Sequence, residues 1–135
     1  MKNEFIENAW PSHVPDRFLD DPFLLFDISE TTGKIKEEDA WKKGDRNAIT
    51  LLKNPCMRVV LIALKSRAII SFHHSGNLAS VQVLEGAANF QSGSNDTLLK
   101  KGGLLTLHND VEHTLVAKEE SVVLLTIAMC PADPI

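Results

Sequence analysis

The stretch SVQVLEGAANFQSGSNDTLLKKGGLLTLH, residues 80–108, decides the fold class of this chain. Apolar residues alternate along SVQV, which puts Val81 and Val83 on one face of a strand. Turn-forming residues follow at Gly86 and in SGSND, residues 92–96, so the runs between them are short. Short alternating runs that are joined by turns indicate antiparallel strands in a sandwich or a closed barrel.

The same pattern extends to both sides of this stretch. Further strands are expected at ITLLK (49–53), RVVLIALK (58–65), HTLVA (113–117) and VVLLTIAM (122–129). Together with the strands of the central stretch they make about eight short strands after residue 47. We therefore predict an all-β barrel that occupies residues 47–135.

Residues 1–46 differ from the barrel and form an N-terminal extension that contains both tryptophans, Trp10 and Trp41. The apolar run PFLLFDI, residues 22–28, predicts one short strand in this extension. Residues 35–43 carry acids first and lysines last, which favours a helix of about two turns ending at Gly44.

Composition excludes several classes of partner. The net charge is −4 and basic residues are not clustered, so no nucleic acid is expected to bind. No run of about 18 apolar residues predicts a membrane span. The start, MKNEFIENAWPSH, lacks the apolar segment of a signal peptide, and two cysteines are no disulfide framework. We expect a cytoplasmic protein.

From His73 onward, the residues resemble the cupin superfamily. HHSGNLASVQVLEG (73–86) resembles the first cupin motif, in which His-x-His is followed by Glu and then by Gly. GGLLTLHNDVEH (102–113) resembles the second motif and ends on its His. The wider stretch from Trp41 to Ala128 is similar to small, single-domain, uncharacterised bacterial cupins of the RmlC-like type. The resemblance implies a double-stranded β-helix, the cupin jelly-roll barrel, with a short N-terminal helix and strand.

The resemblance also implies where a metal ion would be held, namely by two His and one Glu of the first motif and by the His of the second. Counting back from Gly86 puts the Glu place at Ala79, which has no donor atom. With three intervening residues the two His places fall on His73 and Ser75, and with four one of them falls on His74. We prefer His73 and keep His74 as the alternative.

At most two of the usual ligands then remain, His73 and His113. A divalent ion (Fe, Mn, Ni or Zn) at low occupancy is compatible with them, although metal sites usually need three protein ligands. The alternative is a pair of inward polar residues that are hydrogen-bonded to each other, to backbone or to water. We expect His73, Ser75, Ala79 and His113 to line a ligand cavity, and no catalytic residue can be named.

These features predict a cupin-fold protein of unassigned function that binds a small molecule in its barrel. The alternative is a metal-dependent cupin enzyme, of the oxygenase or isomerase type, that uses His73 and His113. A third hypothesis is a structural interaction protein whose barrel is filled by side chains. The resemblance further implies a homodimer, and the apolar run 22–28 would gain from cover on both faces.

Overall fold

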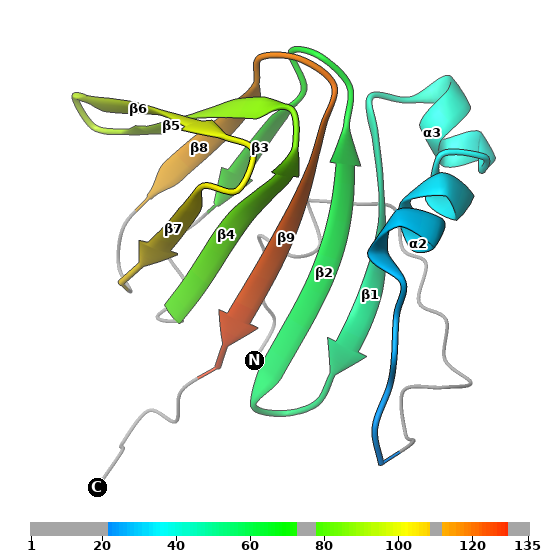
Figure 1. Ribbon diagram of the computed structural model, residues 1–135. Helices are drawn as coiled ribbons and strands as arrows, with labels where there is room; N and C mark the ends of the chain where they lie inside the picture. The colour runs from blue at the N-terminus through cyan, green and yellow to red at the C-terminus, as the bar shows by residue number, and fades with distance from the viewer. Residues whose placement is uncertain (1–21, 73–77, 109–111, 130–135) are drawn as a thin grey trace, which may run out of the picture.

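Two antiparallel β-sheets face each other in the computed structural model, which describes residues 22–72, 78–108 and 112–129 (Figure 1). One sheet has five strands in the order β1-β2-β9-β4-β7, and the other has four in the order β3-β8-β5-β6. The strands are β1 (Arg46–Lys53), β2 (Met57–Leu64), β3 (Ile69–Phe72), β4 (Leu78–Glu85), β5 (Ala87–Ser92), β6 (Asn95–Lys100), β7 (Leu104–Leu107), β8 (His113–Ala117) and β9 (Ser121–Ala128). The predicted all-β jelly-roll architecture is confirmed.

The main core fills the space between the two sheets. Val81 and Val83 of β4 lie in it, as the alternation of SVQV predicts, together with Leu115 of β8 from the facing sheet. Strand β2 is buried on both faces, with Ile62 in this core and Leu61 on the opposite face. This explains why VVLIAL, residues 59–64, is apolar throughout and does not alternate.

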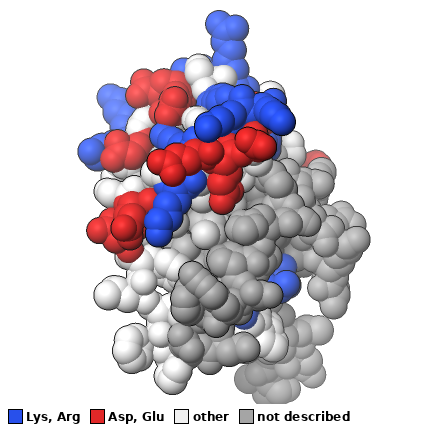
Figure 2. All heavy atoms as spheres, turned by 90° about the vertical axis from the view of Figure 1, so that its right-hand side faces the viewer, with Lys and Arg blue, Asp and Glu red and all other residues white. Residues whose placement is uncertain are grey.

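Two short helices cover the outer face of β1 and β2, namely α2 (Ile28–Ile35) and α3 (Asp39–Lys43) (Figure 1). Their apolar side chains meet those of the sheet in a second cluster, whose buried members are Ile35, Trp41, Leu51, Leu61, Ala63 and Val122. The helices are charged on the side that faces solvent, where lysine and acidic side chains gather (Figure 2). Within the described ranges, no helix is long and apolar enough to cross a membrane.

The strand expected over residues 22–28 is wrong. Residues 23–27 have no regular secondary structure, and Asp27 starts helix α2 by accepting a hydrogen bond from the Glu30 backbone amide at 3.0 Å. Phe26 packs against the outer cluster, whereas Phe23 and Leu25 are 83% and 92% exposed. A helix with Asp27 as its N-cap therefore forms where the strand was expected. The cap satisfies a backbone amide that a strand would have paired with a neighbouring strand.

The helix expected over residues 35–43 is also corrected, because the chain forms two helices that are separated by Lys36–Glu38. The second helix ends with Gly44 as its C-cap residue, as predicted. Asn47, which is 1% exposed, donates hydrogen bonds of 2.8 Å to the Ile35 carbonyl and to the Glu38 carboxylate. This buried amide ties the break between the helices to strand β1.

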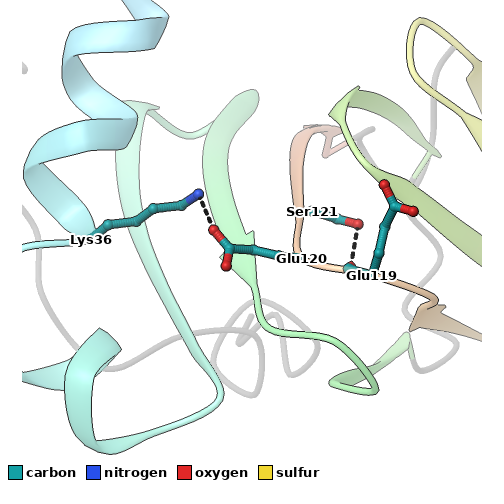
Figure 3. Close-up of polar contacts among 4 residues, drawn as sticks. All are labelled: Lys36, Glu119, Glu120 and Ser121. Carbon is teal, nitrogen blue, oxygen red and sulfur yellow. Dashed lines mark hydrogen bonds and ion pairs between the residues drawn. The ribbon is translucent and has the colours of Figure 1, made fainter.

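Side-chain contacts also join the helices to the turn between β8 and β9. The Lys36 ammonium lies 2.6 Å from the Glu120 carboxylate, across 84 positions of sequence (Figure 3). In the same turn, the buried Ser121 hydroxyl donates to the Glu119 carbonyl at 2.7 Å (Figure 3). The turn is thus fixed both by its own backbone and by the first helix.

Candidate functional site at the barrel mouth

One row of side chains crosses the inner face of the five-stranded sheet at one end. Arg58 lies opposite Ile127, Ile127 lies opposite Ala79, and Ala79 lies opposite Leu107. Directly opposed residues of antiparallel strands face the same side of a sheet. Ile127 belongs to the core between the sheets, so the whole row faces the interior. We call Arg58, Ile127, Ala79 and Leu107 the mouth row.

The facing sheet ends at the same end of the barrel. In Figure 1 the start of β8 and the end of β3 are the lower ends of their strands, as are the start of β4 and the end of β9, which reach further down in this view. His113 is the first residue of β8 and pairs with Phe72 of β3. Leu115 and Ala117 of the same strand lie in the core, so the alternation turns His113 inward as well.

His113 packs against an aromatic ring. Its side chain is buried, at 9% exposure, and its imidazole centroid lies 5.2 Å from that of Phe90, with the two rings tilted. A histidine held in this way has its ring plane fixed by packing before any ligand binds.

Burial decreases from the deep interior towards the mouth. Ile62, Val83 and Val123 lie deeper in the barrel and are at most 1% exposed. Arg58, Ala79 and Leu107 in the mouth row are only partly buried. The deep interior is therefore filled by side chains, and the residues on either side of Ile127 in the mouth row are less buried than Ile127 itself, which is 0% exposed.

Of the four residues expected to line a ligand cavity, the structure describes Ala79 and His113. Strand alternation turns both towards the space between the two sheets, Ala79 from β4 and His113 from β8. That they line one ligand cavity stays a prediction. His73, His74 and Ser75 lie outside the described residues. Ala79 offers only a methyl group at the place where the carboxylate was expected.

The donor set at this site does not fit a standard four-ligand metal centre. In the ranges 22–72, 78–108 and 112–129, no group of three or more His, Cys, Asp or Glu side chains could hold a metal ion. His113 is the expected ligand that falls within these ranges. Ala79 supplies no donor atom, and a divalent ion usually requires at least three protein ligands.

Arg58 is the residue that sequence reasoning missed. Its Nε atom is buried and has no hydrogen-bond acceptor among the residues that the structure describes. The sequence placed Arg58 only as a charge at the start of an apolar run. Since that run is apolar on both faces, the alternation that reveals its inward side could not be recognised from sequence.

Two hollows lie on the outer faces of the sheets. The first, of about 320 Å³, crosses β7, β4 and β9 and is lined by Leu78, Ala79, Ser80, Thr106, Leu107, His108, Thr126 and Ala128. The second, of about 330 Å³, is lined by Ser71, Gln91, Gly93, Glu112, His113 and Thr114. Most of these side chains alternate with the core residues of their strands, so both hollows open away from the barrel interior.

Comparison with known proteins gives matches only at the level of structure. No protein-family model matches the chain, and no curated protein matches it. A conserved Streptococcus pyogenes protein of unknown function is 19% identical with a TM-score of 0.65, over 84% of this chain and 94% of that one. A cupin superfamily protein from Desulfitobacterium hafniense is 13% identical with a TM-score of 0.60, over 63% of this chain and 78% of that one.

The chain has the cupin fold.

Enzymes occur among the solved structures with this cupin arrangement. Salicylate 1,2-dioxygenase from Pseudoaminobacter salicylatoxidans, solved as a point mutant, is 16% identical with a TM-score of 0.66 over 76% of this chain. The match spans 34% of the dioxygenase chain. Because a cupin fold supports unrelated activities, such likeness shows the architecture, and the function must be argued from the site.

Proposed function

We propose that this cupin-fold protein binds a small molecule at the mouth of its barrel without relying on a tightly held metal. The observation that carries the proposal is the mouth row, an inward-facing and partly exposed surface next to a filled interior. Mostly apolar surfaces with a few polar groups are typical of ligand sites. Ala79 removes the carboxylate that would favour a cation there.

A matched pair of substitutions tests whether ligands enter the mouth. Ala79 and Ser80 are neighbours on β4 and both border the outer hollow, but only Ala79 also packs with the core between the sheets. A panel of small organic acids, alcohols, amines and sugars is screened by thermal shift. We expect Ala79→Leu to abolish the shift of any hit and Ser80→Leu to retain it. Hits that survive Ala79→Leu contradict binding at the mouth.

The second candidate is a metal-dependent enzyme that uses His73 and His113. Elemental analysis of protein purified without chelator or affinity tag separates it from the first. We expect iron, manganese, nickel and zinc each to lie well below one equivalent, since the carboxylate place is Ala79. Stoichiometric metal that disappears in His113→Ala would overturn this and favour the enzyme.

Ala79→Glu restores a carboxylate at the expected ligand place. It tests whether metal binding can be gained at this site. If His113 lies within reach of that place, Ala79→Glu should raise metal uptake above that of the wild-type protein. A matched substitution on the outer face, Ser80→Glu, should leave metal content unchanged.

We also propose that the protein forms a homodimer. Support comes from Phe23 and Leu25, whose side chains are largely exposed in the segment before α2. Exposed apolar side chains next to each other are typical of contact surfaces. Light scattering at micromolar concentration should give twice the chain mass, and the double variant Phe23→Ser, Leu25→Ser should give the monomer mass. A monodisperse wild-type monomer would contradict the proposal.

A further inference from the structure

We infer that the mouth of this barrel selects a carboxylate-bearing small molecule with an apolar body, anchored by the guanidinium of Arg58. The inference deepens the proposed function and rests on it. The mouth would then attract anions, because Arg58 supplies a fixed positive charge there. A metal site does the opposite: its anionic ligands attract a cation.

The inward direction of Arg58 follows from the strand register. Val60, Ile62 and Leu64 lie at even positions of β2 and belong to the core between the sheets. The odd positions, such as Leu61, belong to the cluster beneath the helices. Strand β2 pairs with β9 without a register shift, so the even side continues to Arg58.

The energetic state of Arg58 points to a missing acceptor. Its Nε donor is buried without a hydrogen-bond acceptor in the described part of the chain. Leaving a buried donor unpaired costs about 1–3 kcal/mol, and more for a charged group. The residue as a whole is only partly buried, so an incoming carboxylate can reach the guanidinium. A carboxylate matches the planar fork of the guanidinium with charge-assisted hydrogen bonds.

The neighbours of Arg58 favour an anion with an apolar body. Lys53 lies opposite Arg58 on β1 and is exposed, so a second cation stands at the same end of the row. The other members of the row, Ile127, Ala79 and Leu107, are apolar. Their low polarity strengthens the attraction between a guanidinium and a carboxylate relative to water. Their side chains can also pack against the apolar body of the ligand.

On the facing sheet, Glu112 is the acidic residue that precedes His113. It is exposed and lines the outer hollow, so it does not lie in the row that carries Arg58. The ion pairs of the described residues join other partners, such as Lys36 with Glu120 and Arg46 with Asp45. These described residues thus leave the guanidinium of Arg58 available to bind a ligand.

The test compares three probes of equal length and different charge, namely hexanoate, hexanol and hexylamine. Binding is measured by titration calorimetry and by amide chemical shifts of ¹⁵N-labelled protein. We expect hexanoate to shift amides at the start of β2 and of β4 and the end of β9. We expect hexanoate to bind at least about tenfold more tightly than either other probe, as one charge-assisted contact provides.

Variants of Arg58 assign this preference to the guanidinium. Arg58→Gln should weaken hexanoate about tenfold and leave hexanol unchanged, whereas Arg58→Lys should retain part of the preference. Lys43→Gln is the matched control, because the Lys43 side chain is 80% exposed on α3, which precedes Arg46. Arg46 pairs with Leu64, at the end of β2 opposite to Arg58. Lys43→Gln should leave all three affinities unchanged. Circular dichroism checks that each variant is folded.

The outcomes separate this inference from the proposed function. If hexanoate and hexanol bind at the mouth with equal affinity, or if Arg58→Gln keeps the preference, the charge inference is wrong while small-molecule binding stands. If inorganic phosphate displaces hexanoate at equal concentration, the site is a general anion site and the carboxylate assignment is wrong. If no probe shifts the mouth amides and the wider panel gives no hit, the proposed function itself fails.

Discussion

At Gly86 the chain leaves β4 of one sheet for β5 of the other, with a φ of +81°. A Cβ atom at this position would lie 2.3 Å from the Glu120 carbonyl oxygen and 2.9 Å from the Ser121 Cα atom. Both are backbone atoms of the β8–β9 turn, which its own hydrogen bonds and the Lys36 ion pair hold in place. The corner therefore requires glycine for both conformation and space.

We predict that Gly86→Ala lowers the free energy of unfolding by about 3 kcal/mol or more, measured by urea denaturation. Gly93→Ala is the control, since Gly93 also has a positive φ, of +58°, but nothing lies within 4 Å of its added Cβ. This variant should cost about 1 kcal/mol from conformation alone. Equal losses in the two variants would show that the close approach at Gly86 is unimportant.

His113 gives a second prediction at this scale. Its ring is buried against Phe90, so His113→Ala removes one aromatic contact and some packing. We expect the free energy of unfolding of purified protein at neutral pH to fall by about 1–2 kcal/mol, measured by urea denaturation. A structural metal would be indicated instead if the loss exceeded about 4 kcal/mol and if adding a chelator to the wild-type protein caused the same loss.

At the scale of elements, Trp41 is the largest side chain that attaches the helix pair to the sheet. Its side chain is 9% exposed in the outer cluster, and the ammonium groups of Lys36 and Lys65 lie 5.4 Å and 5.0 Å from its ring centroid. Both ammonium groups thus lie within the range of a cation–π interaction with the ring. Trp41 thus joins α3, the residue after α2 and the end of β2.

We predict that Trp41→Ala costs about 3–5 kcal/mol of unfolding free energy, because it removes the largest side chain of the outer cluster. Hydrogen exchange should accelerate first in residues 28–43, and the strands between the sheets should follow only at higher denaturant. Lys36→Gln should cost less than about 1 kcal/mol, since the ion pair that it breaks is exposed. Uniform acceleration over all strands would contradict a separate helical unit.

The elements that the sequence predicts well are those with strong local signals. The strands at 49–53, 58–65, 113–117 and 122–129 appear with ends shifted by at most a few residues. Strand β3 was not predicted, because IISF is too short to show a period of its own. Helix α2 was missed because Thr31, Thr32 and Gly33 are weak helix formers. The capping pattern at Asp27 and Glu30 was the available signal.

The candidate site was less accessible to sequence reasoning than the fold. Motif spacing pointed to Ala79 and His113, whose strand positions turn towards the space between the sheets; that they form one ligand site stays a prediction. It could not locate Arg58, whose role depends on the pairing of β2 with β9, where Arg58 meets Ile127. Pairing between strands distant in sequence is a property of the tertiary structure, and no local pattern encodes it.

For the whole molecule, the proposed division between an extension of residues 1–46 and a barrel of residues 47–135 makes a further prediction. The fragment 47–135 loses α2 and α3, which exposes Leu51, Leu61 and Val122. It also removes both acceptors of the Asn47 side chain. We expect this fragment to aggregate or to bind the dye ANS, whereas the full chain does neither. A soluble fragment with the barrel's circular dichroism would show that the helices are dispensable.

Strand β9, the last described strand in the sequence, lies between β2 and β4 in the five-stranded sheet. During synthesis on a ribosome, β2 and β4 therefore expose unpaired edges until residues 121–128 have left the exit tunnel. Because synthesis proceeds at about 5–20 residues per second, this interval lasts seconds after β4 emerges. We expect stalled chains that lack β9 to recruit chaperones and to be sensitive to protease. Folding of the five-stranded sheet should thus be completed only after β9 has emerged.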